Sequence, residues 1–230
     1  MNHFFAGFNL ITQPGLRRFV IVPLLINIIL FVIALIALIS QLDHITDWAY
    51  SLLPSWLSWL SYLVSPLIII ATFMVFSFIF TAVANFIAAP FNGILAEKTE
   101  HLLTGKSPDY QTTFSSEVTR TLKREWQKLM YVLPKSIGFL ILFWLVPIFG
   151  QVIWFLFSAW IMAIQYCDYP FDNHKVEFGD MKDTLWQHKG SAFSFGGTVV
   201  LFSMVPFINL LVMPVAVCGA TKLWVEEINN

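Results

Sequence analysis

Long apolar runs dominate the pattern of hydrophobic and polar positions along this chain. Residues 19–40 and 63–89 contain no charged side chain. At a helical rise of about 1.5 Å per residue, runs of this length reach the thickness of the hydrocarbon core of a bilayer, roughly 30 Å. The pattern therefore predicts two long transmembrane helices, at about 19–40 and 63–89.

Two later runs, 136–165 and 193–221, are also uncharged, but proline interrupts each of them. Pro147 and Pro206 each lack a backbone N–H and crowd the preceding helical turn, so each favours a break. The halves then cover only about half of the membrane. We expect two re-entrant helical hairpins, at about 136–166 and 193–221. The alternative is one continuous span for each run.

The distribution of charge favours the hairpins. The chain has 13 Lys and Arg residues, and none lies between the first two runs, where Asp43 and Asp47 stand instead. With a cytoplasmic N-terminus and two re-entrant hairpins, all basic residues lie on the cytoplasmic side, as the positive-inside rule prefers. Two continuous spans would carry Lys175, Lys182 and Lys189 to the outside.

Between the two pairs of runs we expect a cytoplasmic amphipathic helical region, at about 90–135. Its residues 115–133 place apolar side chains on one helical stripe and basic side chains on another face. The basic residues are Arg120, Lys123, Arg124 and Lys128. Two interpretations stay open: a membrane-surface helix with its cations toward lipid phosphates, or a basic vestibule that gathers anions. Residues 3–11 similarly predict a short interfacial helix.

Composition agrees with this class of protein. Hydrophobic residues make up 57% of the chain and charged residues 12%, too little charge for a soluble domain of this size. We expect one all-α integral membrane domain, 1–230, embedded in the lipid bilayer. The net charge of −1 predicts no nucleic-acid partner. Cys167 and Cys218 have no metal-ligand neighbours in sequence, so we expect free, buried thiols.

Motifs of catalysis and cofactor binding fail on inspection. The sequence Gly105-Lys106-Ser107 resembles the end of a phosphate-binding loop, but Glu100 stands where the motif needs glycine. The sequence has no zinc-type histidine pairing and no glycine-framed nucleophilic serine. We therefore expect no catalytic residue, no metal and no cofactor.

One candidate site lies at the entrance to the first apolar run. Pro14 and Gly15 suit the tight opening of a helix, and Arg17 and Arg18 follow at once. Free N–H groups at a helix start, the positive end of the helix dipole and two guanidinium groups can together bind an oxyanion. The simpler interpretation is that the arginines only anchor the helix at the cytoplasmic interface.

A second segment, 165–174, follows the third apolar run. Asp168 and Asp172, four residues apart, together with His174 suggest a metal or acid–base site. Pro170 favours another interpretation, a turn that ends the helix with capping by the aspartates. We expect the turn.

At these residues the chain resembles the CysZ-type sulfate permease family, over its whole length and with matching spacing. The motifs that carry the resemblance are Pro14-Gly-Leu-Arg-Arg-Phe19, Ala88-Ala-Pro-Phe-Asn-Gly93, Leu95-Ala96-Glu97-Lys98 and Gln165 to His174. The resemblance implies sulfate import across the inner membrane for cysteine synthesis. It also implies a sulfate-binding loop at Gly15, Leu16, Arg17 and Arg18. The family fold has two long transmembrane helices and two pairs of half-penetrating helices, and it forms homo-oligomers.

Three functions stay in consideration. The first is an anion permease that passes sulfate, and the resemblance favours it. The second is a structural membrane protein that organises partner subunits. The third is a membrane-embedded enzyme that uses Asp168, Asp172 and His174.

Overall fold

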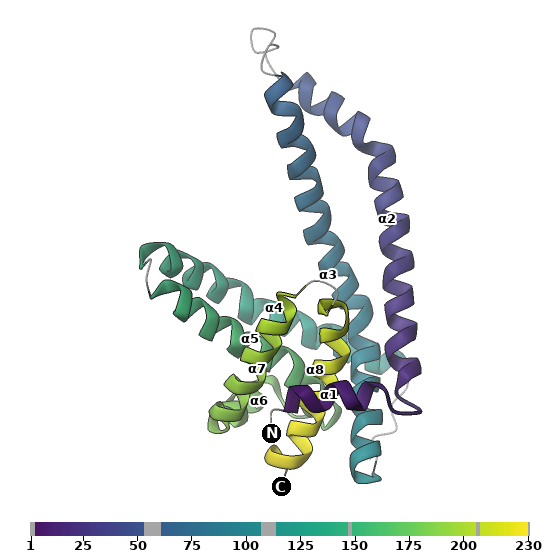
Figure 1. The fold of residues 1–230 in the computed structure, drawn as a ribbon, viewed down its shortest axis with the longest axis vertical. Helices are drawn as coiled ribbons and strands as arrows, with labels where there is room; N and C mark the ends of the chain where they lie inside the picture. Colours follow the sequence, from purple (N-terminus) through teal and green to yellow (C-terminus); the bar gives the residue numbers. More distant parts are fainter. Residues whose placement is uncertain (1–2, 53–60, 107–113, 147–148, 206–207, 230) are drawn as a thin grey trace. The chain divides into compact units, whose positions relative to one another are not determined.

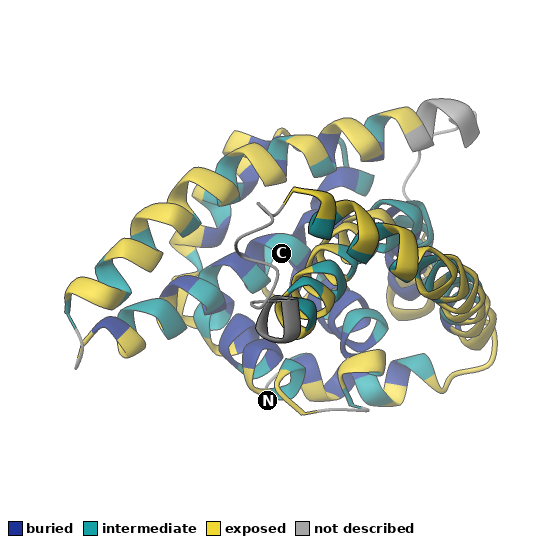
Figure 2. Cartoon of the chain, turned by 90° about the horizontal axis from the view of Figure 1, so that it is seen from above, coloured by how far each residue is buried: buried dark blue, intermediate teal, exposed yellow. Residues whose placement is uncertain are grey.

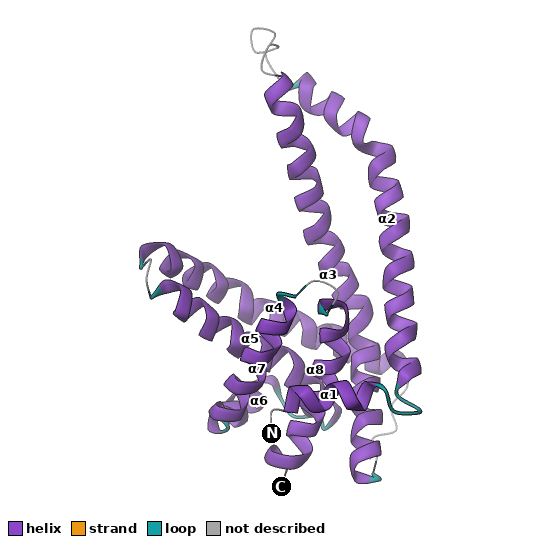
Figure 3. Cartoon of the chain, in the orientation of Figure 1, coloured by secondary structure: helices purple, strands orange, loops and turns teal. Residues whose placement is uncertain are grey.

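The structure is a computed structural model that describes residues 3–52, 61–106, 114–146, 149–205 and 208–229; for 61–64 and 114–118 it describes the backbone only. All regular structure in these ranges is helical (Figure 3). The elements are α1 (His3–Ile11), α2 (Arg17–Ser51), α3 (Ser61–Thr104), α4 (Phe114–Leu145), α5 (Gly150–Asn173), α6 (Phe178–Gln187), α7 (Lys189–Ser203), α8 (Asn209–Leu223) and the π-helix η2 (Trp224–Ile228) (Figure 1). The predicted all-α class is confirmed.

Within the described residues, four helices are long and apolar enough to cross a membrane. They are α2, α3, α4 from Thr119 onward, and α5. The chain is therefore a helical membrane protein with several apolar helices. The first two correspond to the runs at 19–40 and 63–89, but both helices extend further than predicted. α2 continues through 41–51, beyond its predicted end at 40, and α3 continues through 90–104.

The chain divides into two compact units, each described here by itself. One unit is Pro23–Ile87, which holds most of α2 and the first part of α3. Its surface is apolar, since large side chains such as Ile33, Ile36, Leu67, Met74 and Phe78 are exposed. A surface of this kind suits contact with lipid rather than with water.

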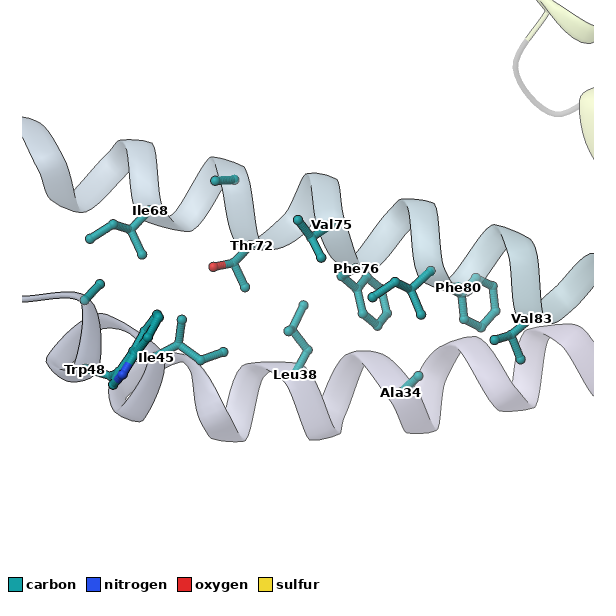
Figure 4. A pocket seen from close by; sticks show the side chains of 13 residues that line it. Ala34, Leu38, Ile45, Trp48, Ile68, Thr72, Val75, Phe76, Phe80 and Val83 are labelled. Carbon is teal, nitrogen blue, oxygen red and sulfur yellow. The ribbon is translucent and has the colours of Figure 1, made fainter. Parts of the chain in front are cut away.

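A groove of about 690 Å³ runs between the two helices of this unit (Figure 4). Its walls are aliphatic and aromatic side chains, among them Leu38, Phe76 and Phe80, with Trp48 toward one end. Phe31 of α2 packs against Phe80 of α3, with ring centroids 5.2 Å apart. Apart from the Trp48 indole, only Thr72 brings a polar side-chain group to the lining. The groove therefore offers almost no donor to an anion.

The other unit comprises residues 1–22 and 88–230, and it contains the buried core. Buried positions line the inward faces of its helices, as the dark blue segments in Figure 2 show. α5 packs along α7, and α1 packs along α8. The largest fully buried side chains of this core are Phe4, Leu95, Ile164, Phe171, Met181, Leu185, Phe195, Val199, Val212, Val215, Val217 and Leu223.

Two helical hairpins form in this unit, close to where the prolines predicted them. α4 ends at Leu145 and α5 begins at Gly150; α7 ends at Ser203 and α8 begins at Asn209. Both pairs pack side by side (Figure 1). Pro147 and Pro206 themselves lie outside the described residues. In the described residues each apolar run therefore contributes to two packed helices rather than to one continuous helix.

The two hairpins differ in the length of their helices. α7 and α8 have 15 residues each, about 22 Å, which is short of the hydrocarbon thickness. α4 and α5 have 32 and 24 residues, long enough to cross. The first hairpin begins at Phe114 rather than at the predicted residue 136, because the polar first half and the apolar second half of α4 form one helix.

Candidate functional site

The short helix α1 lies directly against α8, and this contact fixes the segment that leads into α2. A Cβ atom on Gly7 would stand 2.1 Å from the carbonyl oxygen of Val215, so a side chain there would force the two helices apart. At the start of α1, His3 Nε2 lies 3.1 Å from a carboxylate oxygen of Glu226. The helix predicted at 3–11 is confirmed, and it is docked on the bundle.

A tight turn joins α1 to α2. The N–H of Gln13 donates to the carbonyl of Leu10 at 3.0 Å, and the N–H of Leu16 donates to the carbonyl of Gln13 at 3.2 Å. Gly15 has a φ of +98°, a backbone conformation that side-chain-bearing residues rarely adopt. The Leu16 side chain is 2% exposed and packs in the core. The buried Leu16 side chain therefore anchors the turn to the core.

Arg17 and Arg18 follow this turn as the first residues of α2, and both side chains are exposed. Arg17 Nε donates to the carbonyl of Thr12 at 2.6 Å, which ties the side chain back onto the turn. The Arg18 guanidinium lies 4.8 Å from the ring centroid of Phe19. Within the described part of the chain, neither arginine pairs with a carboxylate. Their outer N–H groups are thus available to an anion.

Backbone donors at the same turn are also unused. The N–H groups of Gly15, Arg17 and Arg18 donate to no backbone carbonyl among the described residues. Such free groups, with the positive end of the helix dipole, favour an oxyanion at a helix start. A Cβ atom on Gly15 would meet nothing within 4 Å, so the space in front of the turn is open.

The structure thus gathers three of the four predicted site residues on one exposed turn. Gly15, Arg17 and Arg18 present donors or open space to solvent. Leu16 differs, since its side chain is buried and its N–H already bonds to Gln13. Its contribution is to hold the turn in position.

A second group of polar side chains joins α4 to the end of α5. Arg120 Nη1 lies 2.9 Å from the Asp172 carboxylate, and Arg124 Nε lies 2.7 Å from the Asp168 carboxylate. Lys128 Nζ lies 3.3 Å from the other oxygen of Asp168. We call these five residues the charge ladder. Lys128 also bonds to Glu125 at 2.6 Å, which in turn lies 3.4 Å from the Tyr169 hydroxyl.

The remaining polar residues after Asp172 bind the end of α5 to α3. His174 Nε2 lies 2.8 Å from the Glu100 carboxylate, and the Asn173 amide donates to the carbonyl of Gly93 at 3.0 Å. The indole of Trp224 packs over the His174 ring, with centroids 5.0 Å apart. The segment 165–174 is therefore a structural junction between helices.

Two predictions about these segments are wrong. α5 does not end at Pro170 but continues through it to Asn173. Pro170 has no N–H and so costs the helix one backbone bond, but the ion pairs of Asp168 and Asp172 with α4 hold the last turns in place. The cations of α4 also do not all face outward. Arg124 and Lys128 are buried against α5, and Arg120 is largely covered.

Cys167 and Cys218 are both free and buried, as expected; the Cys218 thiol lies 3.3 Å from the Thr99 hydroxyl. Among the described residues, no group of three His, Cys, Asp or Glu side chains is arranged to hold a metal ion.

Together, these features define a class: a helical membrane protein with several apolar helices and an exposed pair of arginines at the start of one of them. A match to known proteins makes the class specific. The family described as "Sulfate transporter CysZ/Etoposide-induced protein 2.4" matches residues 3–214 of this chain. The chain belongs to this family.

Individual relatives agree over the full length. The chain is 53% identical to the "Sulfate transporter CysZ" of Pectobacterium atrosepticum over 236 residues, which cover 100% of this chain and 86% of the relative. It is 50% identical to the "Sulfate transporter CysZ" of Vibrio parahaemolyticus over 234 residues, which cover 99% of this chain and 94% of the relative. The predicted family is confirmed, and it is a family of transporters rather than enzymes.

Proposed function

We propose that this chain imports sulfate across the inner membrane for assimilation into cysteine, and that sulfate binds at the turn formed by Gly15, Leu16, Arg17 and Arg18. One observation carries the proposal: two exposed arginines without carboxylate partners in the described chain follow a turn at which the N–H groups of Gly15, Arg17 and Arg18 donate to no described backbone carbonyl. The names of the relatives support the choice of anion.

Sulfate suits this turn for geometric and electrostatic reasons. Its tetrahedral oxygens can accept from a guanidinium group and from backbone N–H groups at the same time. Leu16, buried below, keeps the turn in place, while the open space above Gly15 admits the anion. The turn supplies two positive charges to a dianion, so binding needs no further cation.

Saturable sulfate binding by the purified protein tests the site. The double variant Arg17→Ala with Arg18→Ala should lose binding while it stays folded. Each charge-assisted hydrogen bond contributes about 1.5–3 kcal/mol, so either single variant should bind roughly 10- to 100-fold more weakly. Arg17→Lys should restore binding only in part, because an ammonium lacks the planar fork. Unchanged binding in the double variant would move the site elsewhere.

The proposed topology has a cytoplasmic N-terminus, two full spans in α2 and α3, and two hairpins that enter the membrane from the cytoplasmic side. The positive-inside rule supports it, since every basic residue then stays on one side. The short helices α7 and α8 support the second hairpin. For the first hairpin, only the part of α4 beyond Lys135 is free of charge, about 15 Å of helix.

Side-specific labelling of single cysteines tests this topology. In a cysteine-free protein, cysteines at Lys175, Lys182 and Lys189 should react only from the cytoplasmic side, as should one at Lys106. Reaction from outside at the first three positions alone would make α4 or α5 a full span.

Cross-linking in membranes tests the accompanying proposal of a homo-oligomer, which predicts products at multiples of the chain mass.

A further inference from the structure

The charge ladder has a regular geometry. Its cations Arg120, Arg124 and Lys128 lie four residues apart on α4, and its carboxylates Asp168 and Asp172 lie four residues apart on α5. Residues at this spacing share one face of a helix, about 6 Å apart along its axis. The two helices therefore set a row of positive groups against a row of negative groups.

Burial increases from one end of the ladder to the other. The side chains of Arg120 and Asp172 are 26% and 13% exposed, whereas those of Arg124 and Asp168 are 8% and 2% exposed. Lys128, at the far end, is 3% exposed. The ladder thus has an outer end that solvent reaches and an inner end that is closed.

Stability alone is a poor reason for this arrangement. Removing several charges from water costs about as much as the ion pairs return, so apolar residues of similar size would hold the two helices as well. The pairing is also incomplete. Arg124 Nε bonds to Asp168 and Nη1 to the carbonyl of Val176, but Nη2 is buried and has no partner in the described chain. A buried guanidinium donor without an acceptor favours the binding of an additional acceptor, such as an anion.

We propose that the outer end of the ladder is a second oxyanion site, in which sulfate bonds to Arg120 and to Nη2 of Arg124. In the sulfate-free protein the Asp172 carboxylate occupies Arg120 as a tethered anion. An arriving dianion takes its place, and Asp172, the more exposed carboxylate, moves toward solvent. Asp168 and Lys128 stay paired at the buried, inner end of the ladder. The site rests on the proposed function, because it gives the same anion a second point of contact.

The test uses the outer residues, since substitutions there are tolerated better than at buried Arg124. In the Arg17→Ala, Arg18→Ala background, the turn is disabled and only the ladder can bind. Adding Asp172→Asn removes the competing charge but keeps a hydrogen-bonding group near Arg120. Radiolabelled sulfate should then bind at least roughly ten-fold more tightly than the weak residual binding of the background, because the anion meets one carboxylate fewer. Adding Arg120→Gln to this triple variant should abolish the binding.

Controls separate this inference from the proposed function. Lys222→Gln, which removes a cation that is paired with Glu226 rather than with the ladder, should leave the binding of the triple variant unchanged. Wild-type protein that binds sulfate, together with a triple variant that binds none, would overturn the second site and leave the turn intact. Loss of sulfate binding upon Lys222→Gln would also overturn the second site, because binding would then depend on positive charge in general rather than on Arg120. A purely structural ladder predicts no gain upon Asp172→Asn. Wild-type protein without saturable binding would overturn the proposed function first, and this site with it.

Discussion

The two units of this chain use apolar residues for opposite purposes. In Pro23–Ile87 the large apolar side chains point outward, and the groove between the helices is apolar as well. In the unit formed by 1–22 and 88–230 they point inward to a core, and the polar chemistry sits around it. All 13 Lys and Arg residues belong to this second unit. The comparison separates a part whose apolar surface suits lipid from a part that holds the basic residues and the proposed anion site.

The largest effect we expect comes from the ladder. Asp168→Ala removes the carboxylate shared by Arg124 and Lys128 and leaves buried positive charge without its partner, which should lower the free energy of unfolding by about 3–5 kcal/mol. The pair chosen for comparison is Lys222 with Glu226, which are 26% and 51% exposed, so Lys222→Ala should cost less than about 1 kcal/mol. Denaturant titration in detergent measures both. Equal costs would mean that the ladder is solvated and contributes no more than a surface pair.

The same substitution in both units sharpens the comparison. Phe171 is 1% exposed and packs on Trp224 with ring centroids 4.4 Å apart, whereas Phe78 is 77% exposed. Phe171→Ala should destabilise the protein by about 3–5 kcal/mol through the cavity it leaves. Phe78→Ala should change stability by no more than about 0.5 kcal/mol. The same denaturant titration decides, and a large cost at Phe78 would show that this face is covered by protein.

A smaller effect is expected at the turn. Gly15→Ala places a side chain where φ is +98°, which costs about 1–2 kcal/mol, although the space around the new Cβ is open. Sulfate affinity should fall by about ten-fold as the turn relaxes, while Gly179→Ala serves as control, since it too has open space but no positive φ. Calorimetric titration measures the affinities. A Gly15→Ala protein that binds like wild type would mean that the turn conformation does not shape the site.

Local patterns predicted most of the fold. The uncharged runs gave α2 and α3, the spacing of Phe4 and Phe8 gave α1, and Pro147 and Pro206 marked the neighbourhoods where the hairpins turn. The polar helix α6 was missed, because it has no long apolar stripe to signal it. The continuation of α2 beyond residue 40 was missed because the prediction ended the helix where the uncharged run ends. Charged residues such as Asp43 end the apolar run but not the helix.

The site was predicted only where its residues are neighbours in sequence. Gly15, Arg17 and Arg18 belong to one turn and helix start, so a short motif was enough to propose them as a candidate site. The ladder joins residues that are 40 to 52 positions apart, and no local rule pairs them. One signal was available: the basic residues of α4 and the aspartates of α5 share a spacing of four. That matched spacing, together with the uncharged hairpin between the two segments, predicts facing rows of opposite charge.

The most direct test of the central claim is sulfate flux into proteoliposomes that contain only this chain. Moving a dianion inward against an inside-negative potential costs roughly 4.6 kcal/mol per 100 mV, so uptake should fall when such a potential is imposed and rise when it is reversed. Arg17→Ala with Arg18→Ala should abolish saturable uptake, and Lys222→Ala should not change it. We predict flux in the wild-type protein that saturates with sulfate and depends on both arginines. Wild-type vesicles that take up no more sulfate than empty ones, or equal uptake by the double-alanine protein, would contradict the account.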